Sequence, residues 1–173
     1  MSGLHLNVGS GLPKGKYINK EWVNVDMELF DSPNFVQADV LRGLPFPDNS
    51  FDSVRAVHVL EHINRNSHDE FLREIVRVLK VGGELLIEVP NFIAVCENML
   101  DGYRIGDLEK VRIWTVSIYG KQRHKGDTHC WGFTVQALIQ KMRDTGLEEV
   151  KRSLSMISEH YLIEPVILVK GTK

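Results

Sequence analysis

Four short apolar runs near the start of the sequence each end at a glycine or at a polar side chain that could bind a ligand. The first run ends at Gly9 and Gly11, the second at Asp26, the third at Asp39 and the fourth at His58. Glycine permits a tight turn and the close approach of a ligand to the backbone. One strand-end carboxylate can accept both hydroxyls of a ribose, and another can accept a hydrogen bond from an exocyclic amine such as that of adenine. The pattern indicates a nucleoside-binding site, provided that the fold brings these strand ends together.

A second polar group lies later in the chain, in the stretch KQRHKGDTHCW that begins at Lys121. Its basic residues are Lys121, Arg123, His124 and Lys125, and His129 lies just before a predicted helix. Two interpretations fit: a solvated loop, or a lid that binds an anionic substrate and supplies a base. The basic patch is too short to indicate nucleic acid by itself.

The composition bounds what the chain can be. Its 173 residues are enough for one domain, expected over residues 1–173. With 21 basic and 23 acidic residues the formal charge is −2, so nucleic acid is not an expected partner. The sequence has no apolar stretch of about 18 residues and no export signal at its start, so no membrane span is predicted. The two cysteines form no CxxC and fit a reducing cytosol, so a cytoplasmic location is expected.

Alternating elements are predicted along the chain. Strands are expected at residues 4–8, 22–25, 35–38, 54–59 and 84–89, where apolar runs are bounded by turn residues. A helix is expected over 68–80, with Ser67 and Glu70 as a capping box and with Gly82 and Gly83 at its end.

The second half is less uniform. Residues 92–100 have helical spacing, 108–119 fit either a helix or a strand, and 120–131 are predicted to form a loop. A helix is expected over 135–145 with Thr134 as its N-cap, followed by an antiparallel strand pair at 147–156 and 160–170. The alternation predicts an α/β sandwich around a mostly parallel sheet, in which ligands bind at the carboxyl ends of the strands.

Five stretches carry a resemblance to a known family: LNVGSG, VNVD, ADVLRGLPFPDNSFDSV, HVLEHI and FLREIVRVLKVGGELLIEVP, which cover most of residues 4–90 in order. They resemble the class I methyltransferases that use S-adenosylmethionine (SAM), in the type 11-like group that modifies small molecules and sugars. The resemblance implies a Rossmann-like α/β sandwich with a seven-stranded, mostly parallel sheet whose last strand is antiparallel. It fades after residue 90.

The resemblance also implies roles for individual residues. Gly9 and Gly11 would lie against the methionine part of SAM, and His58 would lie beside the methionine moiety and the transferred methyl group. Asp26 would hold the ribose hydroxyls. The full set that the resemblance assigns to the cofactor is Asn7, Gly9, Gly11, Asp26, Met27, Asp39, Val40 and His58.

The chain departs from the family's pattern in three ways. Asn7 stands where an acidic residue is usual near the amino group of SAM, and Pro13 stands where a third glycine is often found. The segments 12–21 and 27–33 are too short or too broken for the usual helices, so helices are expected to be reduced on one face. Such a face would expose a large apolar patch, which residues 91–131 or a second copy of the chain would cover. The second of these two options predicts a homodimer.

The catalytic candidates are His58 and His129, with His124 and Asp127 behind them. Histidine can accept a proton near neutral pH, as methylation of a hydroxyl or amine requires. The expected function is therefore SAM-dependent methyl transfer to a hydroxyl or amine of a small molecule or sugar, with S-adenosylhomocysteine (SAH) as product. The alternative is a non-catalytic SAM-binding or protein-interaction module.

Other interpretations of the same residues are weaker. The run HVLEH at residues 58–62 fits the H-x-x-E-H signature of a zinc-binding helix, but it begins at the end of an apolar strand. No metal site is predicted. A nicotinamide enzyme would need a G-x-G-x-x-G followed directly by a helix, and PNF at residues 90–92 follows a different strand from the NPP-type motif of adenine N-methylases.

Overall fold

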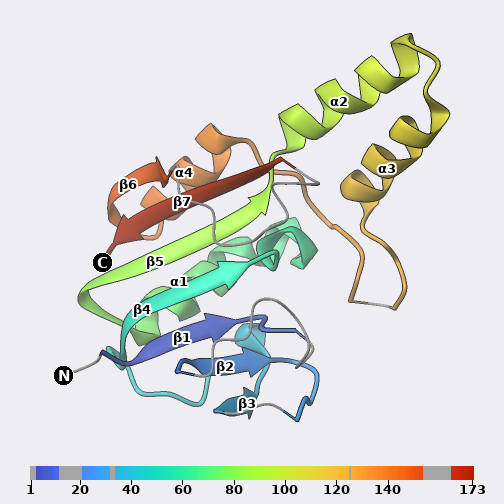
Figure 1. The fold of residues 1–173 in the computed structure, drawn as a ribbon. Helices are drawn as coiled ribbons and strands as arrows, with labels where there is room; N and C mark the ends of the chain where they lie inside the picture. The colour runs from blue at the N-terminus through green and yellow to red at the C-terminus, as the bar shows by residue number, and fades with distance from the viewer. Residues whose placement is uncertain (1–2, 12–20, 32–33, 125, 154–164) are drawn as a thin grey trace.

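A seven-stranded sheet forms the centre of the computed structural model, which describes residues 3–11, 21–31, 34–124, 126–153 and 165–173 (Figure 1). The strand order is β3-β2-β1-β4-β5-β7-β6. Strands β1 to β5 are parallel, and β7 is antiparallel to both of its neighbours. The strands are β1 (His5–Val8), β2 (Val23–Asp26), β3 (Phe35–Gln37), β4 (Phe51–Val57), β5 (Leu79–Pro90), β6 (Glu148–Ser153) and β7 (Val166–Thr172). The predicted α/β class and the antiparallel end of the sheet are confirmed.

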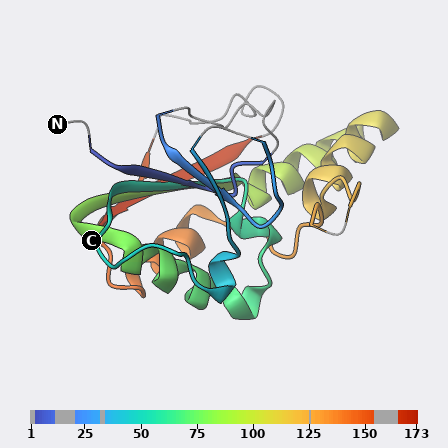
Figure 2. The ribbon, with the colours of Figure 1, turned by 90° about the horizontal axis from the view of Figure 1, so that it is seen from below.

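Helices α1 (His68–Val78) and α4 (Val135–Arg143) cover one face of the sheet, as Figure 2 shows edge-on. Two further helices, α2 (Phe92–Arg104) and α3 (Leu108–Tyr119), form a hairpin after β5. Three short 3-10 helices lie at the ends of strands and before α1: η1 (Val40–Arg42), η2 (Leu60–His62) and η3 (Arg65–Ser67). Among the described residues, no helix has the length and apolar character needed to cross a membrane.

The core lies between the sheet and these two helices. Alternate residues of the central strands, such as Leu6, Val54 and Ile87, are fully buried. They meet the apolar faces of α1 and α4, which include Phe71 and Leu138. A fully buried side chain of this size stabilises the fold by about 1.5–3 kcal/mol, so this layer fixes the strands that carry the polar ends.

The helix predicted over 68–80 begins at His68 as expected, but its predicted cap and its predicted end need correction. Ser67 has φ −102° and ψ 1° and makes no capping hydrogen bond through its side chain, so the predicted capping box is wrong. The reason is that η3 runs directly into α1, whereas a capping side chain needs an extended backbone. The helix ends at Val78, before Gly82 and Gly83. Both glycines belong to β5 instead, and a Cβ on Gly83 would lie 2.8 Å from the Leu79 side chain.

The second face of the sheet carries polar side chains where an apolar patch was predicted. Asn7 pairs in register with Asn24 on β2 and with Arg55 on β4. Asn7 donates a hydrogen bond from Nδ2 to Asn24 Oδ1 over 2.9 Å, and Arg55 Nε donates to Asn7 Oδ1 over 2.9 Å. The Arg55 guanidinium lies 4.6 Å from the centre of the Trp22 ring, which stacks on His5. On β1, β2 and β4 the prediction of an apolar patch is wrong because polar residues alternate with the core residues, whereas β7 places the buried Val166 and Leu168 on this face.

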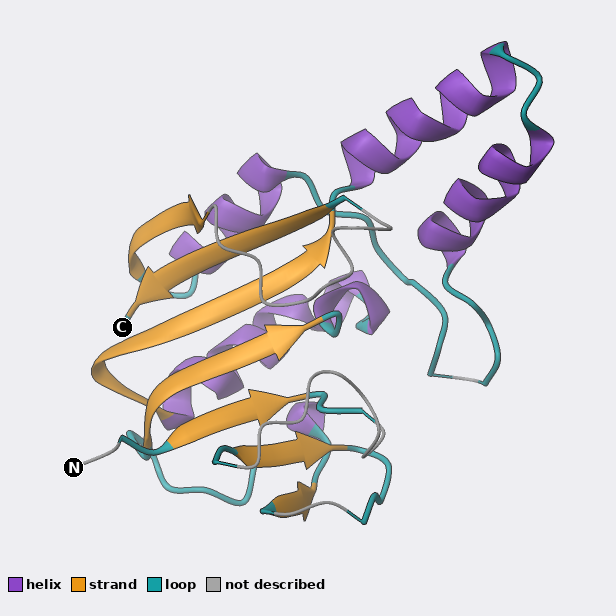
Figure 3. Cartoon of the chain, in the orientation of Figure 1, coloured by secondary structure: helices purple, strands orange, loops and turns teal. Residues whose placement is uncertain are grey.

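The α2–α3 hairpin does not cover this face. Figures 1 and 3 show α2 leaving the carboxyl end of β5, with α3 running back beside it, so that the hairpin extends beyond the sheet. The expectation that residues 91–131 cover the helix-poor face is therefore wrong for the described part of that segment. The segments at 12–20 and 154–164, with Pro13 and parts of the two last predicted strands, lie outside the described residues. Described residues 27–31 contain no helix, as predicted.

We expect Asn7→Ala to lower the free energy of unfolding by about 1–3 kcal/mol, because Asn24 and Arg55 each lose a buried hydrogen-bond partner. Urea denaturation followed by circular dichroism measures the change. The matched control is Asn66→Ala, since Asn66 is exposed. Equal stability of the two variants would show that the polar contacts on the second face contribute nothing to folding.

Candidate functional site

A cavity of about 510 Å³ opens at the carboxyl ends of the first four strands. This volume is typical of small-molecule sites, which span about 300–1,000 Å³. The residues that line it include all but one of the predicted cofactor-binding residues: Gly9, Gly11, Asp26, Met27, Asp39, Val40 and His58. The structure therefore brings together side chains that are up to 49 positions apart in the sequence.

The glycine loop after β1 has two glycines with different roles. Both have positive φ, +64° at Gly9 and +69° at Gly11, where other residues are strained. A Cβ on Gly9 would lie 2.3 Å from Cγ2 of Val59, so this glycine is required by the protein's own packing. A Cβ on Gly11 would meet no atom of the described residues within 4 Å. Gly11 is therefore the glycine that leaves space for a ligand.

Asp26 has a fixed carboxylate at the end of β2. Its Oδ2 accepts a hydrogen bond from Gly11 N over 2.9 Å, and its Oδ1 accepts one from Glu28 N over 3.1 Å. Because a carboxylate has about four acceptor sites, each oxygen keeps one for a ligand. The side chain therefore joins the glycine loop to β2 and still presents two acceptors to the cavity.

Asp39 also lines the cavity, and its side chain caps η1. Its Oδ1 accepts a hydrogen bond from Leu41 N over 3.0 Å, and its Oδ2 lies 3.5 Å from Arg42 Nε. Apolar side chains form much of the cavity wall, among them Val8, Val25, Ala38, Val40 and Phe71. A flat heterocycle with one polar edge fits this combination of apolar walls and a single carboxylate.

Asn7 is not among the residues that line the cavity. The side chain is 1% exposed and is engaged with Asn24 and Arg55 on the second face of the sheet. Strand geometry explains this position, because successive side chains point to opposite faces, and Val8 is the residue that reaches the cavity.

His58 ends β4 in an uncommon backbone conformation, with φ +53°. Its Nδ1 lies 3.0 Å from Oε1 of Glu61, and its Nε2 lies 3.8 Å from Oε1 of Glu88. Both carboxylates are buried, at 1% and 0% exposure. The imidazole is therefore held between two acids in the cavity wall, and the strained backbone aims it there.

The loop after α3 closes one side of the cavity. Arg123, His124, Gly126 and Asp127 line it. The Arg123 guanidinium donates to both oxygens of Asp127, over 2.7 Å and 3.2 Å. These hydrogen bonds lower the pKa of Asp127 from 3.8 to about 2. The contribution of this pair to stability is therefore fully present above pH 3.8 and is lost as the pH falls through about 2.

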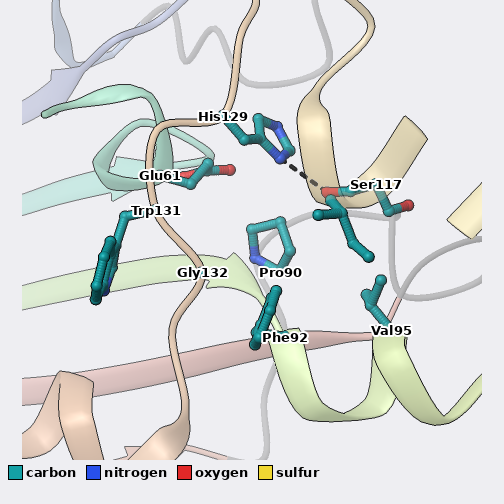
Figure 4. A pocket seen from close by; sticks show the side chains of 9 residues that line it. Glu61, Pro90, Phe92, Val95, Ser117, His129, Trp131 and Gly132 are labelled. Atoms are coloured by element: carbon teal, nitrogen blue, oxygen red, sulfur yellow. Dashed lines mark hydrogen bonds between the residues drawn. The ribbon is translucent and has the colours of Figure 1, made fainter. Parts of the chain in front are cut away.

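His129 lies beside a second, small cavity of about 10 Å³ (Figure 4). The backbone carbonyl of Ser117 accepts a hydrogen bond from His129 Nδ1 over 2.8 Å. The ring packs edge-to-face on His62, with 4.7 Å between ring centres. His129 does not line the large cavity, whereas His62 does.

Glu61 and His62 are site residues that the sequence analysis did not select. Backbone N–H groups of Cys130 and Trp131 donate to the Glu61 carbonyl, and this fastens the loop before α4 onto η2.

Burial opposes the charge of Glu61, but the His58 hydrogen bond and the neighbouring imidazoles lower the pKa of its carboxyl. Burial also lowers the pKa of His62. The H-x-x-E-H spacing is the one sequence signal that points to these two residues. It could not show their role, because the loop that contacts His62 at Thr128 lies 66 positions later in the chain.

Comparisons with known proteins agree with this geometry. Residues 16–87 match the family model of the methyltransferase domain. The C-methyltransferase UbiE of ubiquinone and menaquinone biosynthesis from Pseudomonas aeruginosa is 43% identical over 63 residues, which are 36% of this chain and 23% of UbiE. The sterol 24-C-methyltransferase ERG6B of Gibberella zeae is 37% identical over 113 residues, 65% of this chain and 26% of ERG6B. The chain thus spans about a quarter of the length of these curated relatives.

Solved structures share the fold over nearly the whole chain. A SAM-dependent methyltransferase from Thermotoga maritima has a TM-score of 0.61 and 19% identity, covering 100% of this chain and 83% of its own. The 1,6-didemethyltoxoflavin-N1-methyltransferase of Burkholderia thailandensis, solved with its substrate and SAH, has a TM-score of 0.61 and 14% identity, covering 99% and 71%. The resemblance predicted from the sequence is confirmed: residues 16–87 match the methyltransferase domain family, and the chain has the class I SAM-dependent methyltransferase fold.

Proposed function

We propose that this chain binds SAM in the large cavity and transfers its methyl group to a hydroxyl or amine of a small molecule or sugar. One observation carries the proposal: Gly11, Asp26, Asp39 and His58, which come from four different strand ends, line a single cavity of ligand size. The placement follows the rule that open α/β sheets bind ligands outside the carboxyl ends of their strands.

The residues present fit the parts of SAM. Asp26 offers one free acceptor site on each oxygen for the two ribose hydroxyls. Asp39, with the backbone of Val40, would accept from and donate to the adenine edge between apolar walls. The open space beside Gly11 would take the methionine part. Met27 is exposed at the rim of the cavity and would cover the ribose.

SAM, when bound, supplies a methyl group that its sulfonium already activates. The protein's remaining work is to align an acceptor and to remove its proton. His58 reaches the cavity and is held by Glu61 and Glu88, so those carboxylates would stabilise an imidazolium that forms when His58 accepts a proton. His129, with His124 and Asp127 on the loop after α3, would act on the acceptor side.

The kind of atom that accepts the methyl group is also a proposal. The two curated relatives are named C-methyltransferases and the Burkholderia thailandensis enzyme is named an N1-methyltransferase, so the similar proteins methylate different kinds of atom. A hydroxyl or amine is favoured here because histidines lie beside both cavities to take its proton.

The location and assembly of the protein are also proposals. Neither Cys96 nor Cys130 forms a disulfide, which supports a cytoplasmic protein. A homodimer in which a second copy covers the helix-poor face would give, by light scattering, twice the 19.7 kDa of the chain. A strictly monomeric mass would remove this proposal.

The alternative function is a SAM-binding module without turnover. The observation that favours it is the position of Asn7, whose amide is committed to Asn24 and Arg55 and gives the cavity no carboxylate for the SAM amino group. The module would bind SAM but convert none of it to SAH with any acceptor, whereas the enzyme would release SAH with at least one.

We expect Asp26→Ala to weaken SAH binding by at least about 30-fold, because hydrogen bonds from both ribose hydroxyls to a carboxylate are worth about 2 kcal/mol or more. Isothermal calorimetry with SAH measures the change. Asp144→Ala is the matched control, since Asp144 is an exposed aspartate at the end of α4. Equal affinities of the two variants would contradict the placement of the ribose.

We expect His58→Asn to reduce methyl transfer by at least about 100-fold and to leave SAH affinity within a few-fold of the parent. Asparagine suits this test because it tolerates the positive φ of this position without an imidazole. Release of SAH from SAM with a panel of hydroxyl and amine acceptors gives the rate, and calorimetry gives the affinity. Undiminished turnover would exclude His58 as the proton acceptor.

A further inference from the structure

Three side chains with metal-binding atoms converge between the two cavities. One ligand atom from each of Glu61, His62 and His129 lies within 4.8 Å of the other two. Glu61 and His62 come from η2, and His129 comes from the loop before α4. The backbone hydrogen bonds from Cys130 and Trp131 to Glu61 hold these two segments together. The cluster is therefore built by a fixed tertiary contact between segments far apart in the sequence.

Both histidines have their tautomer set by backbone carbonyls. The Nδ1 of His62 lies 3.1 Å from the carbonyl oxygen of Thr128, and the Nδ1 of His129 lies 2.8 Å from that of Ser117. A carbonyl oxygen can only accept, so Nδ1 carries the proton in each ring. In a neutral ring the Nε2 lone pair is then available. Histidines that bind a metal characteristically donate their other N–H in this way, which fixes the orientation of the ring.

Within the described part of the chain, only one of the two carboxylate oxygens of Glu61 has a hydrogen-bond partner. Its Oε1 accepts from His58 over 3.0 Å, whereas its buried Oε2 has no hydrogen-bond partner within the described part of the chain. Glu61 as a whole is 1% exposed. A buried carboxylate oxygen without a partner is costly, and here two imidazole acceptors lie beside it. A cation bound between these three groups would satisfy all of them at once.

The space beside the cluster suits a small ion. The cavity lined by Glu61 and His129 has a volume of about 10 Å³ (Figure 4), close to the size of one water molecule. Ligand atoms around a tetrahedral zinc ion lie about 3.3 Å apart, given bond lengths of about 2.0–2.1 Å. The ligand atoms would therefore have to move closer by about 1.5 Å at most, which is within the reach of side-chain rotations.

We propose that Glu61, His62 and His129 form a binding site for a divalent first-row transition-metal ion, with Zn²⁺ as its representative. Two imidazoles and one carboxylate suit such ions better than Mg²⁺ or Ca²⁺, which prefer oxygen ligands alone. Three protein ligands leave at least one coordination position open. Because His62 also lines the large cavity, and if the proposed function holds, that position faces the acceptor and would bind a hydroxyl oxygen.

The test is metal binding without any SAM. Protein carrying Cys130→Ser, which removes the exposed thiol beside His129, is stripped with a chelator and titrated with Zn²⁺ by calorimetry and with Co²⁺ by visible absorption. We expect one equivalent of either ion to bind, with a Co²⁺ spectrum free of a thiolate band. In this background His129→Ala and Glu61→Gln should each weaken binding at least about 10-fold.

The matched control is His124→Ala, because His124 is a half-exposed histidine of the same loop outside the cluster. It should bind the ion as the parent does. Circular dichroism confirms that each variant is folded, and Glu61→Gln keeps the acceptor for His58. A folded parent that binds no Zn²⁺, or binding that His129→Ala leaves unchanged, would overturn the proposal. Calorimetry with SAH on metal-free protein separates this failure from a failure of the proposed function.

Discussion

The parallel pairing of β1, β2 and β4 is the constraint on which the rest of the structure depends. Parallel strands in register end at the same edge of a sheet, so the residues directly after them meet there whatever their distance in sequence. Val25, Val8 and Ala56 are register partners across β2, β1 and β4, at or next to the ends of these strands. The glycine loop, Asp26 and His58 are close together for this reason, before any of their own contacts form.

The same register produces the polar second face. Asn7, Asn24 and Arg55 are direct neighbours across three strands, one residue before the positions that point into the core at the cavity end. Their mutual hydrogen bonds satisfy groups that would otherwise be costly to bury. Where these polar side chains pair, the second face needs no apolar helix to cover it. On β7 the same face carries Val166 and Leu168. The short connections after β1 and β2 thus coincide with the polar part of this face.

Features that depend on local periodicity and on strand ends were the ones best predicted from the sequence. Four strand ends and α1 could be placed because buried alternation and helical spacing are visible along the chain. The α3 segment was ambiguous, and the structure gives the reason: no residue of α3 is buried, so no core imposes a helical pattern on its apolar residues. The second face was misjudged although Asn7, Asn24 and Arg55 show polar alternation. Their effect depends on cross-strand pairing, which the sequence does not display.

Glu61 shows why the centre of the site could not be predicted. By sequence it is the second residue of a short helix, and an acidic residue near a helix start needs no further explanation. In the structure its backbone carbonyl receives the loop that follows α3, and its carboxylate has His58 on one oxygen. One residue thus joins the wall of the large cavity to the loop that carries His129. That loop lies nearly 70 positions after Glu61 in the sequence. The burial of the Glu61 carboxylate is therefore a property of the tertiary fold. Any chemistry on the acceptor side depends on the contact between this loop and Glu61.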